Sequence, residues 1–200
     1  MLDFDLTPRR ALPEPAGNQR PGGGVTVREL QGLGIATMLA RKGQTKFLRE
    51  RIRSHFLVEL PHRPVCAAAD GVRFIGTGSG SWLVMKDGGS DAFGAALRQV
   101  TTPLASVSDQ SGGYAAFRIG GPNAREALAK GFTIDLDAVA FAKGDAATTI
   151  VSHIGATIWR DGDDPQGRSV FGVVVFRSLA RSFWHWLSSS SAEFGLELSD

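Results

Sequence analysis

The segment from Ser106 to Gly131 constrains the fold more than any other part of the chain, because four structural signals follow one another in it. They are the end of a strand at residues 107–109, a Ser-Gly-Gly turn at 111–113, a second strand at 114–119, and a helix from Gly120-Gly121-Pro122 to Gly131. Proline suits the first helical position because its missing N–H would have no intrahelical partner there, and glycine is common where a helix ends. The segment therefore predicts a hairpin followed by a short helix.

A second unit of the same kind is predicted upstream. Residues 72–76 and 82–85 have the composition of strands, and a helix is expected from about Ala92 to Val100 with Ser90 or Asp91 as its cap. Four residues of this helix would face the core: Phe93, Ala96, Leu97 and Val100. The two hairpin-plus-helix units, 72–100 and 105–130, are compatible with an internal repeat of structure.

The turn between the first two strands, Gly76-Thr77-Gly78-Ser79-Gly80, is not predicted to bind a nucleotide. A dinucleotide-binding fingerprint requires a glycine-rich turn that opens a helix, whereas the chain continues here as a strand. Position 81 is serine where the pattern needs its third glycine, and Lys86 lacks the spacing of a phosphate-loop lysine. The turn is therefore expected to connect a hairpin.

Two longer amphipathic helices are expected, one near the start of the chain and one at its end. The first covers Gln44–Phe56, and the second runs from about Leu179 to Phe194 with Ser178 as its N-cap. Their apolar stripes are predicted to be Phe47, Leu48, Ile52 and Phe56 in the first helix, and Leu179, Phe183, Trp186 and Leu187 in the second.

Further strands are expected at residues 34–39, 146–151, 156–159 and 170–176, the last two separated by an acidic loop at Asp161–Gly167. The helices are too few and too irregularly interleaved with strands for a doubly wound parallel sheet. The sequence therefore predicts an α+β fold.

Residues 1–24 are predicted to form a flexible, extended arm, because four prolines and four glycines in this stretch resist both helix and sheet. Two interpretations stay open. The arm is either a disordered tail without a role or a segment that wraps a partner subunit, with Phe4, Leu6 and Leu12 as anchors.

Composition indicates a soluble globular protein, since 42% of the residues are hydrophobic and can form a sizeable core. No stretch approaches the roughly 20 apolar residues that span a bilayer. Met1–Leu6 contains acidic residues and lacks the apolar region of a secretory signal. Cys66 is the only cysteine and cannot form an internal disulfide, which is compatible with a reducing compartment. The expected location is the cytoplasm, with no membrane partner.

The formal charge of +2 hides an asymmetry, because residues 1–100 carry 14 basic and 9 acidic side chains and residues 101–200 carry 8 and 11. Six basic residues are opposed only by Glu50 within one short run: Arg41, Lys42, Lys46, Arg49, Arg51 and Arg53. The run is either a solvated helix face or a surface that docks onto an acidic partner. Nucleic acid is disfavoured as a partner because the run has no interleaved aromatic residues and no known binding module.

No arrangement of residues in the sequence predicts catalysis or metal binding. The candidate metal ligands are scattered without a zinc spacing: His55, His62, His153, His185 and Cys66. The Gly-x-Ser-x-Gly elbow of a serine hydrolase is missing. Asp161, Asp163 and Asp164 lack the glycine and glutamate positions of a calcium loop. We therefore assign no catalytic, cofactor-binding or metal-binding residue.

The order Asp-x-Ser, short turn, apolar-x-Arg-apolar strand and Gly-Pro-x-Ala helix in residues 106–131 resembles the aminomethyltransferase (glycine cleavage T-protein) superfamily. The closer resemblance is to the gamma subunits of heterotetrameric sarcosine oxidases. It rests also on three further segments, 78–83 (GSGSWL), 128–136 (LAKGFTIDL) and 175–187 (VFRSLARSFWHWL), and covers roughly residues 30–195. This resemblance implies a T-protein-like fold. Residues 25–200 would form one domain of two related, closely packed subdomains, each an antiparallel sheet with two helices, that exchange an edge element.

The resemblance implies a non-catalytic subunit of a complex that oxidises the N-methyl group of sarcosine to give glycine, hydrogen peroxide and formaldehyde or 5,10-methylenetetrahydrofolate. Alpha, beta and delta subunits would be the partners, mainly alpha, and would hold FAD, FMN, NAD and tetrahydrofolate. The family's Asn-rich loop before the catalytic aspartate has no counterpart here, and residues 167–171 (GRSVF) replace the segment that carries its acidic folate ligand. Asp109 matches the Asp-x-Ser element but is not assigned a catalytic role. Two alternatives remain, a standalone folate-binding protein and the equivalent subunit of another N-methyl amino acid oxidase or dehydrogenase.

Overall fold

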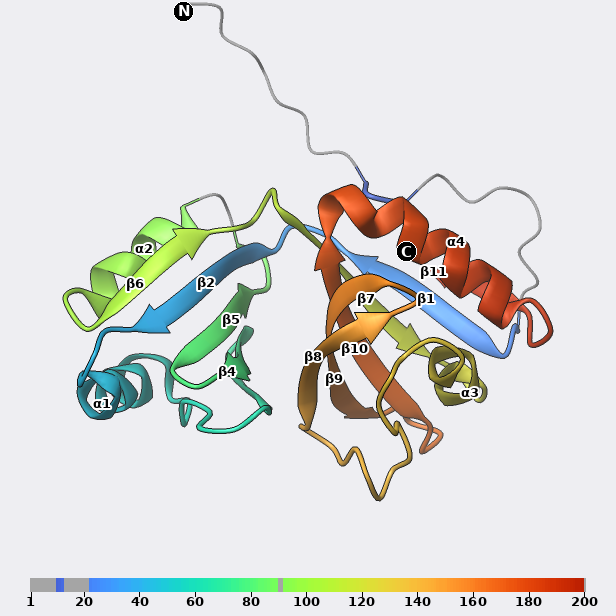
Figure 1. Ribbon diagram of the computed structural model, residues 1–200, viewed down its shortest axis with the longest axis horizontal. Coiled ribbons are helices and arrows are strands. Elements are labelled where there is room, and N and C mark those ends of the chain that lie inside the picture. The colour runs from blue at the N-terminus through green and yellow to red at the C-terminus, as the bar shows by residue number, and fades with distance from the viewer. Residues whose placement is uncertain (1–9, 13–21, 90–91, 200) are drawn as a thin grey trace, which may run out of the picture.

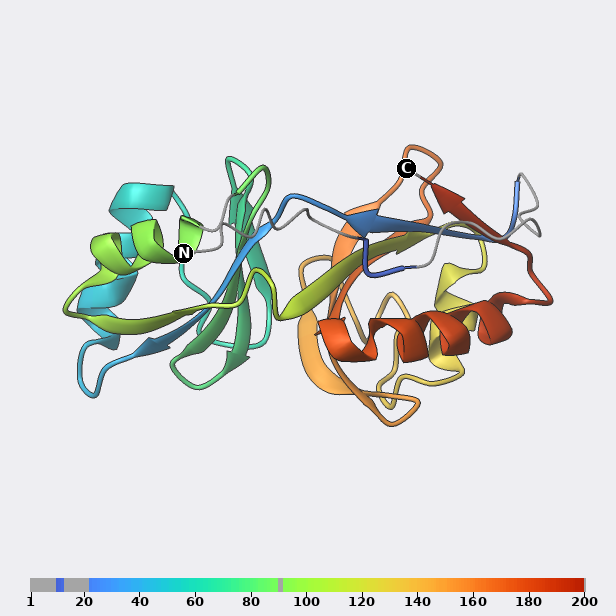
Figure 2. The same cartoon turned by 90° about the horizontal axis from the view of Figure 1, so that it is seen from above.

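The computed structural model describes residues 10–12, 22–89 and 92–199, which form two β-sheets lying side by side (Figure 1). Each sheet carries two helices on the face turned away from the other sheet (Figures 1 and 2). The predicted α+β class is confirmed.

The larger sheet has six strands among the described residues. In spatial order they are β11 (Leu196–Ser199), β1 (Val25–Leu30), β7 (Tyr114–Gly120), β10 (Ser169–Phe176), β9 (Ile154–Asp163) and β8 (Ala146–Val151). Neighbouring strands are antiparallel except β11 and β1, which are parallel. Helices α3 (Ala124–Ala129) and α4 (Ala180–Ser191) cover the outer face, and a 3-10 turn at Arg177–Leu179 leads into α4.

The smaller sheet has five strands in the described part of the chain, and all its neighbours are antiparallel. In spatial order they are β3 (Cys66–Ala69), β4 (Val72–Gly78), β5 (Ser81–Lys86), β2 (Gly34–Ala40) and β6 (Ala105–Asp109). Helices α1 (Thr45–Phe56) and α2 (Phe93–Thr101) cover its outer face. The hairpin predicted from the turn at residues 76–80 is confirmed as β4 and β5.

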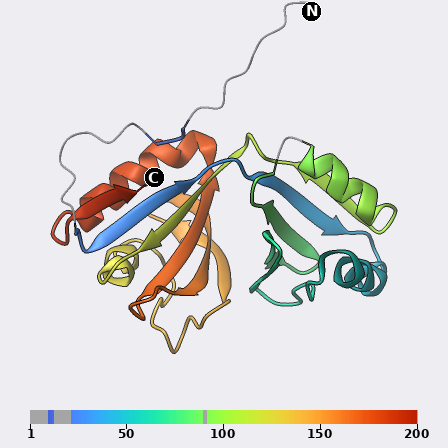
Figure 3. The same ribbon diagram turned by 180° about the vertical axis from the view of Figure 1, so that it is seen from behind.

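The chain passes between the two sheets twice, from β1 to β2 and from β6 to β7, and the two connections run side by side (Figures 1 and 3). Strands β1 and β7 pair with each other in the larger sheet, and β2 and β6 pair in the smaller one. The whole smaller sheet with its helices is therefore inserted between two neighbouring strands of the larger sheet.

The hairpin predicted around the turn at residues 111–113 is wrong in its pairing. The turn exists, since the N–H of Gly113 donates to the carbonyl of Gln110 at 2.9 Å. However, Ser111 is attached to β2, where its Oγ accepts the N–H of Ile35 at 3.0 Å. The same turn sequence can connect two strands of a hairpin or two strands in different sheets. Which connection forms depends on the strands that lie beside each of them in the folded chain.

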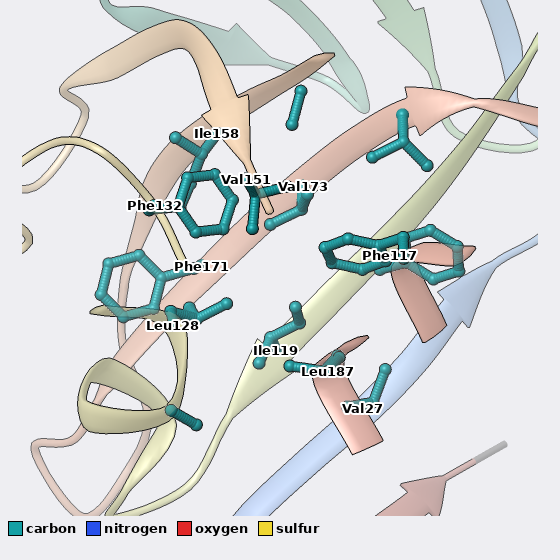
Figure 4. Packing of buried hydrophobic residues seen from close by; sticks show 14 of the residues in the cluster. Val27, Phe117, Ile119, Leu128, Phe132, Val151, Ile158, Phe171, Val173 and Leu187 are labelled. Atoms are coloured by element: carbon teal, nitrogen blue, oxygen red, sulfur yellow. The ribbon is translucent and has the colours of Figure 1, made fainter. Parts of the chain in front are cut away.

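The main hydrophobic core lies between the larger sheet and helices α3 and α4 (Figure 4). Phe117 of β7 and Phe183 of α4 stack with their ring centroids 5.3 Å apart. Leu128 of α3 and Leu187 of α4 are fully buried on the same face of the sheet. Burial of such apolar side chains, at about 1.5–3 kcal/mol each, fixes both helices on the sheet.

A separate core fills the smaller sheet and α1 and α2, and a third cluster joins the two sheets. This third cluster contains no helix residues: its buried members are Ile35, Ile75, Leu83, Met85, Ala116, Ala146, Trp159 and Val174. Two main-chain hydrogen bonds add to it, from Cys66 to Gly144 at 2.7 Å and from Ala146 to Pro64 at 3.1 Å. The sheets are therefore joined by packing as well as by the two chain crossings.

The predicted helices α1 and α2 are present, but not every residue of their stripes is buried. Leu48 and Ile52 of α1 are fully buried, whereas Phe47 is 55% exposed. In α2, Phe93 and Leu97 are buried, and Ala96 is exposed. The proposed caps Ser90 and Asp91 lie outside the described residues, and Ala92 takes the N-cap position.

Helices α3 and α4 begin later than predicted. Pro122 precedes α3 instead of occupying its first position, because Asn123 is the N-cap. Ser178 lies inside the 3-10 turn and makes no capping hydrogen bond, and Leu179, the N-cap of α4, is 36% exposed. Phe183 and Leu187 nevertheless face the core as predicted.

Three strands were not predicted, namely β1, β3 and β11. Strands β1 and β11 pair with segments distant in the sequence. Strand β3 instead forms a hairpin with β4 across the two-residue turn Asp70-Gly71, a local signal that the sequence does contain. The predicted acidic loop is also shorter than expected, because β9 continues to Asp163.

Part of the N-terminal stretch packs on the chain itself. The N–H groups of Ala11 and Leu12 donate to the carboxylate of Glu29 at 2.7 and 3.2 Å, and the Leu12 side chain is buried in the main core. Leu12 is therefore an internal anchor, contrary to its predicted use against a partner. The other two proposed anchors, Phe4 and Leu6, lie outside the described residues.

A glycine in the middle of β10 offers a test of this packing. A Cβ atom at Gly172 would lie 2.0 Å from two atoms of the Trp159 indole, and Trp159 is only 1% exposed and cannot move into solvent. We expect Gly172→Ala to lower the free energy of unfolding by about 1–3 kcal/mol, as overpacked cores do. The midpoint of urea unfolding measures this change.

The matched control is Gly155→Ala in the neighbouring strand β9, where an added Cβ would meet no heavy atom within 4 Å. This variant should change stability by less than about 0.5 kcal/mol. Equal effects of the two substitutions would contradict the packing of Trp159 on Gly172.

Candidate functional site

A cleft of about 480 Å³ opens where the two sheets meet. One wall comes from β1, β7, β9 and β10 of the larger sheet, and the other from β4 and the turn after β5. Arginines, carboxylates and one indole dominate its polar lining: Arg10, Arg28, Arg73, Arg118, Glu29, Asp87, Asp161 and Trp159. These groups can bind and orient a ligand. Among the described residues that line the cleft there is no histidine, cysteine or lysine.

Two ion pairs lie along the cleft. Arg73 Nη2 is 3.1 Å from Asp87 Oδ2, a normal ion-pair distance. Arg118 Nη2 is 3.7 Å from Asp161 Oδ2, which is too long for a hydrogen bond. The first pair is therefore well formed and the second is loose.

Trp159 forms the floor of the cleft. Its indole ring lies against Gly172, where no side chain would fit, and its Nε1–H points to Asp161 Oδ1 at 3.4 Å. The guanidinium carbon of Arg73 lies 5.9 Å from the ring centroid, within cation–π range. The tryptophan thus links the two sheets at the base of the cleft.

Cys66 lies close to the cleft but is not a reactive thiol. Burial raises the pKa of Cys66 to about 12, the nearby Arg73 lowers it and Asp161 raises it further. Because the thiolate is the nucleophile and metal ligand, this residue is protonated and inert at neutral pH.

The four histidines do not converge on any site. His55 lies on α1, His62 in a loop, His153 in the turn between β8 and β9, and His185 on α4, and all four side chains are exposed. Within residues 10–12, 22–89 and 92–199, no group of three or more histidine, cysteine, aspartate or glutamate residues is placed to hold a metal ion.

Asp109 has a structural environment. Its Oδ1 accepts the N–H of Ser111 at 3.1 Å, and its side chain packs against Gly94 of α2, where a Cβ would come within 2.5 Å of Asp109 Oδ2. The carboxylate therefore shapes the crossing from β6 to β7 and fixes α2 beside it.

The four tryptophans pack mainly inside the chain. Trp82 and Trp159 are 2% and 1% exposed, and Trp82 donates its Nε1–H to the carbonyl of Pro61 at 2.8 Å. Trp184 and Trp186 on α4 are partly buried against the main core, and the Trp186 ring lies 5.7 Å from that of Phe183. Helix α4 is therefore largely engaged with its own sheet.

Helix α1 offers a different surface, because several of its basic residues and two apolar ones are exposed. Phe47 is 55% exposed and Leu57, directly after the helix, is 73% exposed. Leu57 has a φ of +57°, a conformation that favours glycine. Arg51 donates a hydrogen bond to the carbonyl of Val100 in α2 at 2.9 Å, and Arg53 is paired with Glu59 at 3.0 Å.

None of the helices described is long and apolar enough to cross a bilayer.

Sequence reasoning missed the cleft residues Arg28, Arg118 and Trp159. The strand Val25–Leu30 has the alternation of a half-buried strand, with Val25 and Val27 on the core face and Arg28 on the other, and this signal could have been found. The position of Arg28 opposite Arg118 could not have been predicted from the sequence, because it depends on which strand lies beside β1.

Comparison with solved structures shows which known fold the chain has. A chain of the heterotetrameric sarcosine oxidase from Corynebacterium sp. U-96, solved in complex with pyrrole 2-carboxylate, matches with a TM-score of 0.73 and 23% identity over 90% of this chain and 87% of that one. The glycine cleavage system aminomethyltransferase T from Bartonella henselae matches with a TM-score of 0.61 and 12% identity over 88% of this chain and 48% of that one. The protein thus has the T-protein-like fold that its sequence resembles, in a chain that covers about half the length of that aminomethyltransferase.

The family follows from the sequence itself. The model of the "Sarcosine oxidase, gamma subunit family" matches residues 52–193, well over half of the chain. The chain therefore belongs to the sarcosine oxidase gamma subunit family, as the resemblance indicated. A search of curated proteins gave no match.

The unusual pKa of Cys66 leads to a test. Because its pKa is raised from 9.0 to about 12, the thiolate fraction in the folded chain at pH 8 should be roughly a thousandfold lower than in the unfolded chain. We expect negligible reaction with a chromogenic disulfide reagent at pH 8 in buffer and rapid reaction in 6 M urea. The unfolded state loses its proton first, so stability should fall as pH rises from about 9 toward 12. A Cys66→Ser variant should lose the thiol reaction in urea, and rapid labelling of the folded wild-type chain would contradict the assignment.

Proposed function

We propose that this chain is a non-catalytic subunit of a multi-subunit sarcosine oxidase and stabilises its assembly. The observation that carries the proposal is the match of residues 52–193 to the gamma subunit family. The proposal of a non-catalytic role is supported by two observations: the histidines are exposed and scattered, and Cys66 is protonated.

In this proposal the complex oxidises the N-methyl group of sarcosine with O2 to give glycine, hydrogen peroxide and either formaldehyde or 5,10-methylenetetrahydrofolate. Alpha, beta and delta subunits hold FAD, FMN, NAD and tetrahydrofolate, and this chain packs mainly on the alpha subunit. The complex works in the cytoplasm, where a free cysteine such as Cys66 persists.

Helix α1 is the surface that we assign to the partner. Lys46, Phe47 and Arg49 are exposed on α1, and Leu57 is exposed directly after it. A surface with basic and apolar side chains fits an acidic surface with an apolar centre, because charge complementarity orients the partner and apolar burial supplies affinity. Helix α4 is a poorer candidate, since its tryptophans already pack on the main core.

Co-purification tests the proposal. The tagged chain, expressed in its native host and recovered gently, should bring down large polypeptides with a flavin spectrum and sarcosine-dependent peroxide production. Recovery of a lone colourless chain that binds tetrahydrofolate would refute this proposal and favour a standalone folate-binding protein, for which the cleft is the available space. Activity with a different N-methyl amino acid would keep the subunit role and change the substrate.

The α1 assignment makes a narrower prediction. The double variant Lys46→Glu/Arg49→Glu should reduce recovery of the partner chains at least tenfold, because reversed charge at an interface costs several kcal/mol. Arg181→Glu, which changes an exposed arginine on α4, is the matched control and should leave recovery unchanged. Equal recovery with both variants would exclude α1 as the interface.

A further inference from the structure

The cleft contains two arginines whose positions are direct cross-strand partners. Arg28 of β1 lies opposite Arg118 of β7 in the register of the larger sheet, and both line the cleft. Like charges placed directly opposite one another on antiparallel strands are destabilising. The pairs two residues away on the same face of the sheet, Thr26 with Gly120 and Leu30 with Ala116, are uncharged. Arg28 and Arg118 are therefore the charged pair of β1 and β7 on the face that lines the cleft.

The positive charge of this arginine pair is only partly compensated. Arg118 has only the loose 3.7 Å contact with Asp161, and its side chain is 46% exposed. Arg28 is exposed and forms no ion pair with a residue that the structure describes. Asp87 does not serve this pair, because it is engaged by Arg73 at 3.1 Å. The two guanidinium groups therefore have between them one loosely held carboxylate, that of Asp161.

The rest of the lining suits the organic part of a ligand. Leu30 and Leu33 offer aliphatic surface, whereas the Trp159 indole is buried beneath Gly172 and supports the cleft from below. A volume of about 480 Å³ falls in the range of small-molecule sites, about 300–1,000 Å³.

We propose that this cleft binds a carboxylate between Arg28 and Arg118, with the organic part of the ligand against Leu30 and Leu33. Arginine guanidinium groups match the planar, forked geometry of a carboxylate. A dianion such as phosphate fits less well, because Asp87 and Asp161 also line the cleft. The carboxylate belongs either to a free organic acid or to an aspartate or glutamate side chain of a partner subunit. Binding of a free acid is independent of the subunit role proposed above, whereas binding of a partner's side chain rests on it.

Calorimetric titration of the full chain with benzoate tests the site, and benzamide is the neutral ligand of the same shape. Benzoate should bind and benzamide should not. Arg28→Gln and Arg118→Gln should each weaken benzoate binding at least tenfold, because each removes a charge-assisted contact. Arg125→Gln, on α3 and paired with Asp137, is the control and should leave binding unchanged.

A thermal melt separates lost binding from lost folding. Arg28→Gln removes a like-charge neighbour, so its Tm should equal or exceed that of the wild-type chain while its benzoate affinity falls. A lowered Tm for Arg28→Gln together with unchanged benzoate affinity would indicate that the pair supports the sheet and would overturn the proposal.

Co-purification with the same variants distinguishes the two sources of the carboxylate. If a partner side chain supplies it, Arg28→Gln and Arg118→Gln will lower recovery of the partner chains. If a free acid supplies it, recovery will be unchanged while the loss of benzoate binding persists. The proposal fails if neither benzoate affinity nor partner recovery responds to these two variants.

Discussion

The structure depends on the two connections by which the chain crosses between the sheets, from β1 to β2 and from β6 to β7. Because β1 pairs with β7 and β2 pairs with β6, the two connections leave one sheet together and enter the other together. The crossing after β6 is fixed by Ser111, whose Oγ accepts the N–H of Ile35 at 3.0 Å and whose N–H donates to Asp109 at 3.1 Å. These contacts satisfy backbone groups that neither sheet ladder could reach, and an unpaired buried backbone group would be costly. These hydrogen bonds therefore fix the path of the chain where it crosses from β6 to β7.

The packing between the sheets follows from this exchange. Once the strands have crossed, the inner faces of both sheets meet over a cluster that includes Ile75, Met85 and Trp159. The cluster does not extend across the whole larger sheet, because the cross-strand row that begins with Ala146 and Trp159 continues through Gly172 to Arg118 and Arg28. The cleft lies where this row changes from apolar to charged side chains. Its position is thus a consequence of sheet register.

The fold is shared with an aminomethyltransferase, but a shared fold does not transfer a reaction. Asp109, the residue that matches the superfamily's Asp-x-Ser element, is used here to shape the crossing and to support α2. Helix α1 exposes several basic side chains together with Phe47, and Leu57 is exposed directly after it.

The sequence by itself determined the α+β class, the helices α1, α2 and α4 to within a few residues, and the strands with strong apolar patterns such as β10. These elements follow from local periodicity, which the sequence contains in full. Even here tertiary contacts changed details, since Phe47 matches the stripe of α1 yet lies exposed, and Leu12 in the proline-rich stretch is buried. Only the tertiary structure decided the long-range strand pairing: β6 and β7 look like a hairpin but join different sheets, and β11 is a strand only because β1 lies beside it. The cleft was beyond sequence reasoning for the same reason, because Arg28 and Arg118 are 90 residues apart and become neighbours only through long-range hydrogen bonding between β1 and β7.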